Sequence, residues 1–154
     1  MGADFSSGMV ARAESARRQA GIVNCRFVVA EAGALPFLEA GFDSVRSTAS
    51  LKFWPDPVGG LCEIHRVLAP GGKALLIEAD REISPEEIPP FLGELGLSDL
   101  ARPVGAFLLL RFVRRVGVTR EEAAQMAQRS RFGGGKVEPI PRSPFFCMEL
   151  VRQV

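Results

Sequence analysis

The chain has 154 residues, of which 47% are hydrophobic and 24% charged, and its formal net charge is +1 at pH 7. These values are typical of one globular domain with enough apolar material for a core. The near-neutral charge gives no general attraction to nucleic acid, and no apolar stretch is long enough to cross a bilayer. We therefore expect a single domain over residues 1–154 that has no nucleic-acid or membrane partner.

The three cysteines, Cys25, Cys62 and Cys147, are scattered without the spacing of metal ligands. Their odd number suits reduced thiols, and the N-terminus lacks the basic and apolar segments of a signal peptide. We expect a cytoplasmic protein without a metal site.

Strands and helices alternate along the first half of the chain. Residues 9–20 carry apolar residues at helical spacing and precede Gly21, so they predict an amphipathic helix. Residues 26–30 are short, apolar and β-branched and predict a buried strand, and residues 42–48 predict another. Residues 57–68 predict a helix that has Asp56 as its N-cap.

Pro70-Gly71-Gly72 is expected to end that helix, and the apolar residues 73–79 predict a parallel strand covered on both faces. Ser84 and Thr119 each begin a capping pattern that predicts a helix. Residues 84–118 are expected to form a helical insertion that covers a pocket, packs on a second subunit or joins the core. Residues 137–140 and 145–151 predict two closing antiparallel strands.

This alternation predicts a doubly wound α/β sheet, in which ligands lie at the carboxyl ends of the strands. Between residues 26 and 80, the order of Leu35-Pro36-Phe37, Trp54-Pro55-Asp56-Pro57 and Pro70-Gly71-Gly72 is specific. It resembles the middle and C-terminal part of class I S-adenosylmethionine-dependent methyltransferases, of the small-molecule type related to ubiquinone and menaquinone biosynthesis enzymes. The resemblance implies a Rossmann-like sheet, mostly parallel with an antiparallel C-terminal strand, that has helices on both faces. It also implies S-adenosylmethionine as cofactor and a small-molecule methyl acceptor that the sequence does not identify.

The resemblance places cofactor-binding residues at the ends of three strands. Asp4 matches the acid that accepts hydrogen bonds from the ribose hydroxyls, although it also stands where a helix is capped. Glu31, where the family usually has aspartate, matches the acid facing the adenine amino group, and Ala32 follows it at the ring; a solvated loop carboxylate is the alternative. Thr48 lies where the family binds the methionine part, although turn hydroxyls are common.

No catalytic residue is assigned, because the reactive sulfonium mainly requires proximity and alignment. The single histidine, His65, is expected on a helix surface. Arg46 interrupts a predicted buried strand, so we expect either one uncovered flank or an acidic partner such as Asp43 or Glu78.

The family's first strand and glycine-rich loop have no counterpart before Asp4. We therefore expect that the chain joins neighbouring strands, borrows a strand from a partner or is part of a longer protein. Two functions remain open: a methyltransferase with weakened cofactor binding, or a non-catalytic interaction protein. The latter would dimerise through strand edges and residues 107–112 without a cofactor.

Overall fold

The computed structural model describes residues 1–154 and divides the strands between two sheets. A two-stranded sheet pairs β1 (Gly2–Asp4) with β2 (Phe27–Val29). A four-stranded sheet has the order β3-β4-β6-β5. Its strands are β3 (Phe42–Thr48), β4 (Leu68–Ala79), β5 (Lys136–Pro139) and β6 (Phe145–Val151).

Five α-helices connect these strands, and side chains cap several of them. The helices are α1 (Ser7–Gln19), α2 (Pro57–Val67), α3 (Ile88–Glu94), α4 (Arg102–Val116) and α5 (Arg120–Arg129), with 3₁₀ turns at Leu51–Phe53 and Pro85–Glu87. The predicted N-caps Asp56 and Thr119 accept hydrogen bonds from the backbone amides of Gly59 and Glu122, each at 3.0 Å. None of the helices combines the length and the apolar character needed to span a membrane.

Strand direction confirms the predicted α/β class. β1 runs parallel to β2, and β3 runs parallel to β4. β6 is antiparallel to both β4 and β5, as the C-terminal pattern predicts. The expected bounds of β3 and β6 agree with the structure, because their alternating or apolar runs are bounded by clear turn residues.

Two local expectations were wrong. The predicted buried strand β2 is half-exposed, and Val29 keeps 54% of its accessible surface. Pro70-Gly71-Gly72 does not separate α2 from the next strand, because α2 ends at Val67 and β4 begins at Leu68. These residues instead lie opposite a shift of the β3–β4 register, where Gly71 has a φ of 79°.

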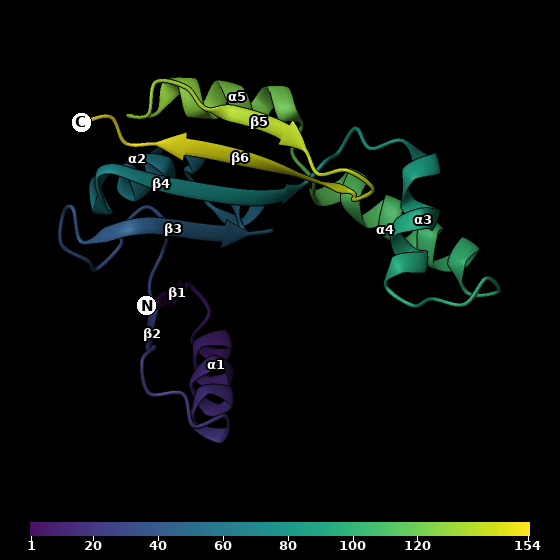
Figure 1. The fold of residues 1–154 in the computed structure, drawn as a ribbon, viewed down its shortest axis with the longest axis horizontal. Helices are drawn as coiled ribbons and strands as arrows, with labels where there is room; N and C mark the ends of the chain where they lie inside the picture. The colour runs from purple at the N-terminus through teal and green to yellow at the C-terminus, as the bar shows by residue number, and fades with distance from the viewer.

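The main core lies between the four-stranded sheet and the helices α2 and α5. Its buried side chains include Leu61 and Ile64 of α2, Leu76 of β4, and Phe146 and Met148 of β6. A third expectation, that residues 73–79 are covered on both faces, was also wrong: α2 and α5 cover one face, and alternate residues of β4, such as Leu75, stay exposed on the opposite face. The helices α3 and α4 form a smaller cluster and project from one end of the sheet (Figure 1).

The two sheets are not joined by hydrogen bonds between β1 and β3. β1, α1 and β2, here called the N-terminal unit, lie on the β3 side of the larger sheet (Figure 1). Only β2 pairs with β1, and only β4 pairs with β3, so each strand leaves one edge free. No residue before Leu51 is buried. The space between the two sheets is therefore open to a ligand.

Candidate functional site

A cavity of about 850 Å³ lies between the N-terminal unit and β3. Its walls come from β1, from residues 30–32 after β2, from β3, and from residues 49–50 and 53–55. The volume is in the range of small-molecule sites. Because β1 and β3 both lead into it, the cavity lies where α/β sheets bind ligands.

Asp4 lines this cavity at the end of β1. Its Oδ1 accepts a hydrogen bond from the Ser6 amide at 2.8 Å, and the Ser6 hydroxyl caps α1 by accepting from the Met9 amide at 3.4 Å. One carboxylate oxygen thus shapes the strand-to-helix turn, while the other has no hydrogen-bond partner within the protein. The turn role and a ligand-binding role are compatible at this residue.

Glu31 and Ala32 line the same cavity directly after β2. The amide of Ala30 donates to the carbonyl of Asp4 at 3.0 Å, so the parallel pairing extends past the end of β2. This contact brings the Asp4 and Glu31 segments to the same wall. The Glu31 side chain is exposed and has no hydrogen-bond partner within the protein.

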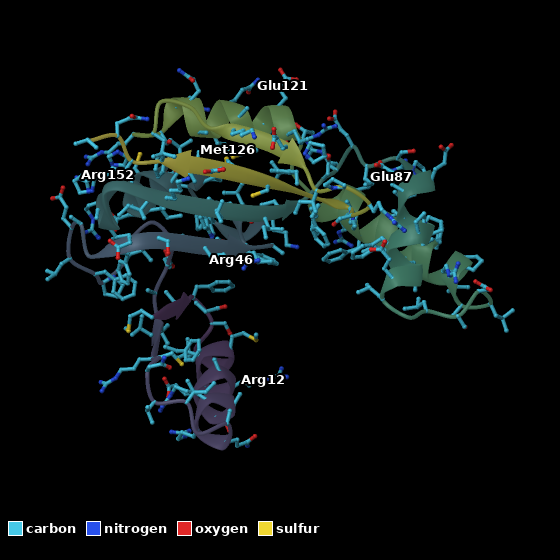
Figure 2. All side chains as sticks on the ribbon, viewed as in Figure 1. Arg12, Arg46, Glu87, Glu121, Met126 and Arg152 are labelled. Atoms are coloured by element: carbon cyan, nitrogen blue, oxygen red, sulfur yellow. The ribbon has the colours of Figure 1, made fainter.

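Thr48 and Arg46 line the cavity from β3, where both side chains are exposed. Residues two apart in a strand share one face, so the hydroxyl and the guanidinium point to the same side of the sheet. Arg46 lies at the sheet edge that faces the N-terminal unit (Figure 2) and forms no ion pair with Asp43 or Glu78. The uncovered flank of β3 accounts for an arginine in this strand.

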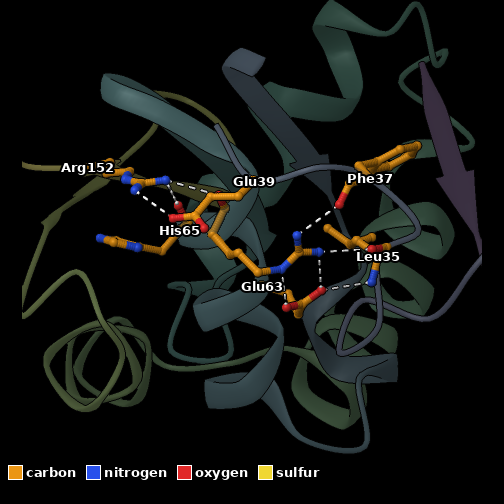
Figure 3. A network of polar contacts seen from close by, with 7 residues as sticks. Leu35, Phe37, Glu39, Glu63, His65 and Arg152 are labelled. Carbon is orange, nitrogen blue, oxygen red and sulfur yellow. Dashed lines mark hydrogen bonds and ion pairs between the residues drawn. The ribbon is translucent and has the colours of Figure 1, made fainter. Parts of the chain in front are cut away.

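The cavity wall at residues 35–37 is held by a charged pair on α2 (Figure 3). Arg66 contacts both carboxylate oxygens of Glu63 at 2.7 and 2.8 Å. It also donates to the carbonyls of Leu35 at 3.0 Å and Phe37 at 2.8 Å, and Glu63 accepts from the Leu35 amide at 3.0 Å. The hydrogen bond from Arg66 lowers the pKa of Glu63, although partial burial opposes it.

A buried carboxylate positions the turn after β3. Glu78 retains 2% of its accessible surface, and its Oε1 accepts hydrogen bonds from the amides of Ser50 and Leu51, each at 3.0 Å. Burial raises the pKa of Glu78, while those backbone hydrogen bonds and the nearby Lys52 act in the opposite direction. Ser50 lines the cavity, so Glu78 shapes its wall without lining it.

His65 lies outside the cavity and is less exposed than the sequence predicts. Its Nδ1 is buried without a hydrogen-bond partner, and its ring meets Phe132 edge-on at a centroid distance of 5.0 Å. Burial, and then the positive charges of Arg152 and Arg131, lower its pKa. The histidine therefore belongs to the α2 packing surface and has no contact with the candidate site.

The four residues predicted to bind a cofactor thus line one cavity, but sequence reasoning missed the residues that shape it. Glu63 and Arg66 carried a detectable signal, namely opposite charges three residues apart on a helix. Glu78 also carried one, since it is an acid within the apolar run of β4. Neither signal identifies the distant loop or turn to which these side chains bind.

Comparisons with known proteins agree with this geometry. A sequence model of the methyltransferase domain family matches residues 1–76. Demethylmenaquinone methyltransferase of Lactococcus lactis is 33% identical over 105 residues, which cover 62% of this chain and 42% of that protein. The Thermus thermophilus enzyme of the same name is 38% identical over 78 residues, covering 51% of this chain and 35% of its own length. The chain spans less than half the length of these relatives.

Solved structures show the same fold. A SAM-dependent methyltransferase from Aquifex aeolicus superposes with a TM-score of 0.68 at 14% identity, covering 97% of this chain and 65% of that one. Another SAM-dependent methyltransferase, from Thermotoga maritima, superposes with a TM-score of 0.64 at 19% identity, covering 99% of this chain and 72% of that one. The fold is therefore that of the Rossmann-like methyltransferases. The fold and the sequence matches support the resemblance to class I S-adenosylmethionine-dependent methyltransferases, and residues 1–76 are the part that matches the methyltransferase domain family.

Proposed function

We propose that this chain binds S-adenosylmethionine in the cavity between the N-terminal unit and β3 and contributes to methyl transfer to a small molecule. The observation that carries the proposal is the meeting of Asp4, Glu31, Ala32 and Thr48 at one cavity. These residues come from the ends of three strands, and their side chains suit a ligand with several polar groups.

The chemistry of the lining residues fits this cofactor. The free oxygen of Asp4 suits a ribose hydroxyl, and the unpaired Glu31 carboxylate suits the adenine amino group. Apolar residues such as Ala32 and Phe5 provide surfaces for the ring. Arg46 is the only arginine or lysine that lines the cavity, and it suits the cofactor's carboxylate.

When bound, the cofactor supplies an electrophilic methyl group on a sulfonium. The protein's task is then to hold the acceptor in line and to exclude water, and no general base is required of an acceptor that is already nucleophilic. Relatives are named as methyltransferases of demethylmenaquinone and, in Arabidopsis thaliana, of 2-methyl-6-phytyl-1,4-hydroquinone. We propose a hydroquinone-type ring as the acceptor on that basis, because the reduced ring is electron-rich, can attack the sulfonium methyl group and can release a proton to water.

A second function is favoured by one feature, the free edges of β1 and β3. Unpaired strand edges are templates for pairing with another chain. A methyltransferase-like protein that dimerises through these edges and binds no cofactor remains the alternative.

Calorimetric titration of the full chain with S-adenosylmethionine and S-adenosylhomocysteine separates the two functions. We expect micromolar binding, and we expect Asp4→Ala to weaken it by roughly 1 to 3 kcal/mol, the scale of a lost charge-assisted hydrogen bond. Asp43→Ala is the matched control, because Asp43 is an exposed aspartate of β3 outside the cavity lining. A folded sample without binding would favour the interaction protein, and unchanged affinity in Asp4→Ala would remove Asp4 from the site.

A further inference from the structure

Helix α4 is apolar on two sides, although only one of them packs against the protein. Its inner side contributes Val113 to the smaller core. Its outer side exposes Val104 at 64%, Phe107 at 65% and Leu108 at 58% of their accessible surface, here called the α4 apolar end. Leu100, just before the helix, is 91% exposed. Large apolar side chains gathered in this way mark an interaction surface.

The same outer side becomes strongly basic one turn later. α4 contains four arginines and no acidic residue. Arg102 pairs with Asp99, whereas Arg111, Arg114 and Arg115, here called the α4 arginines, form no ion pair in the structure. The spacing of 104, 108, 111 and 115 places two of these arginines on the face of the apolar end.

We propose that the outer face of α4 docks on an anionic lipid surface, with the α4 apolar end at the acyl boundary and the α4 arginines at the phosphates. At 1.5 Å per residue, Phe107 and Arg111 are about 6 Å apart along the axis, and Phe107 and Arg115 about 12 Å. The two groups are thus neighbours along one face, which suits a helix that lies in the plane of the interface. Arginine stems can also follow apolar surface while their charged ends stay at the headgroups.

Charge argues against a second copy as the occupant of this face. Pairing two outer faces of α4 would gather six guanidinium groups without any carboxylate on either helix to neutralise them. A lipid surface that carries phosphates supplies both the acyl region and the negative charge that this face lacks.

A chain of aromatic contacts links this face to the candidate site. The Lys52 ammonium lies 4.6 Å from the ring centroid of Phe112, which is 52% exposed, and 4.8 Å from that of Phe53. The ring of Phe53 is 6.4 Å from that of Phe5, and both residues line the cavity. Docking through α4 would therefore bring the cavity mouth close to the lipid surface. The proposal revises the expectation of no membrane partner, which rested on the lack of a spanning segment.

Vesicle flotation of the full chain tests the proposal. We expect the protein to float with vesicles of phosphatidylcholine and phosphatidylglycerol in equal parts, but not with phosphatidylcholine alone, and to be released by salt. The double variant Phe107→Ser and Leu108→Ser should reduce binding at least tenfold, on the order expected for two apolar side chains. Arg111→Gln should reduce it about fivefold, and so should Arg115→Gln.

The matched controls change the same residue types elsewhere. Val23→Ser with Leu38→Ser alters two exposed apolar loop residues, and Arg12→Gln with Arg129→Gln alters two exposed helical arginines. Circular dichroism would verify that each variant is folded. The proposal would be overturned if the folded wild-type protein does not float with the anionic vesicles, or if the α4 variants bind these vesicles as the wild type does. The proposal would also be overturned if the wild-type protein does not bind anionic vesicles but forms a dimer that the Phe107/Leu108 variant disrupts. That result would assign the outer face of α4 to a second copy of the chain.

Discussion

At the scale of single residues, Glu78 is a buried carboxylate whose charge state affects the stability of the structure. Its carboxylate sits at the end of β4 and receives two backbone hydrogen bonds from the turn after β3. Those bonds favour the ionised form, but burial dominates and raises the pKa of Glu78. The residue thus joins two parallel strands while carrying a cost of desolvation.

Glu78→Gln should change how stability depends on pH. The folded protein holds the Glu78 proton to a higher pH than the unfolded chain does, so the Glu78 contribution to the free energy of unfolding is complete below the ordinary glutamate pKa. This stabilising contribution is lost as the pH rises from the ordinary glutamate pKa through the raised pKa of Glu78 in the folded protein. Glutamine keeps an acceptor for both amides but does not ionise, so the variant should gain stability relative to the wild type as pH rises.

Urea unfolding of both proteins between acidic and neutral pH measures this difference. Glu82→Gln is the control, because Glu82 is exposed and close in sequence. A stability difference that stays constant with pH, or that falls as pH rises, would show that the Glu78 carboxylate is not destabilised by burial.

Residue-level contacts set the limit of what the sequence predicts about this site. Asp4, Glu31 and Thr48 were predicted because each matches a family position at the end of a strand. The contacts of Glu78 with Ser50, and of Arg66 with Leu35, join residues that are 28 and 31 positions apart. Such contacts depend on how a helix or strand meets a distant loop, which no local pattern of charge or hydropathy specifies.

At the scale of elements, the wall of the cavity depends on how closely α2 meets Trp54. Gly60 is buried in α2, and a Cβ atom there would lie 2.5 Å from Cε3 of the Trp54 indole. That separation is far below the contact distance of two carbon atoms. Trp54 also lines the cavity, so the glycine allows the helix to support that wall.

Gly60→Ala should therefore destabilise the protein although alanine favours a helix. The gain in helix propensity is about 1 kcal/mol, whereas overpacking a buried contact costs roughly 1 to 3 kcal/mol, so we expect a net loss of about 1 kcal/mol. Urea unfolding measures the loss, and the emission of Trp54, the only tryptophan, should shift as its ring moves.

Gly8→Ala in α1 is the control for this prediction. A Cβ at Gly8 would meet only the Ser6 hydroxyl, at an ordinary distance of 3.8 Å. That variant should not lower stability or alter the emission of Trp54. Equal effects of the two substitutions would show that the Gly60–Trp54 contact is not tight.

Elements that depend on local signals were predicted well. Asp56 and Thr119 begin their helices because side-chain capping is a local interaction. The burial of β2 was predicted wrongly, because an apolar run does not indicate whether another strand or helix covers it. In this structure β2 has β1 on one side and α1 beside it, and neither buries its side chains fully.

At the scale of the whole molecule, the two sheets differ in how well they are supported. The four-stranded sheet holds the main core with α2 and α5, while the N-terminal unit contains no buried residue. Sequence reasoning left open whether neighbouring strands would join, and in the structure β1 and β3 do not pair. The family resemblance assigned Asp4, Glu31, Ala32 and Thr48 to one cofactor, and all four line the space between the two sheets.

This asymmetry predicts that the N-terminal unit opens independently of the main sheet. Local opening costs little free energy where few apolar side chains are buried. Amides of α1, β1 and β2 should therefore exchange with deuterium at least about a hundredfold faster than those of β4 and β6, once intrinsic rates are corrected. Hydrogen exchange read by mass spectrometry on proteolytic fragments resolves these segments.

The same measurement with S-adenosylhomocysteine present connects stability to the proposed site. A ligand that bridges Asp4 and Thr48 should slow exchange in the N-terminal unit and β3, because it binds only when the N-terminal unit is folded beside β3. Protection in β5, which lies at the far edge of the larger sheet, should stay unchanged. Equal protection of all strands without ligand would mean that the molecule unfolds as one cooperative unit. The N-terminal unit would then have to be stabilised by contacts other than strand pairing between β1 and β3.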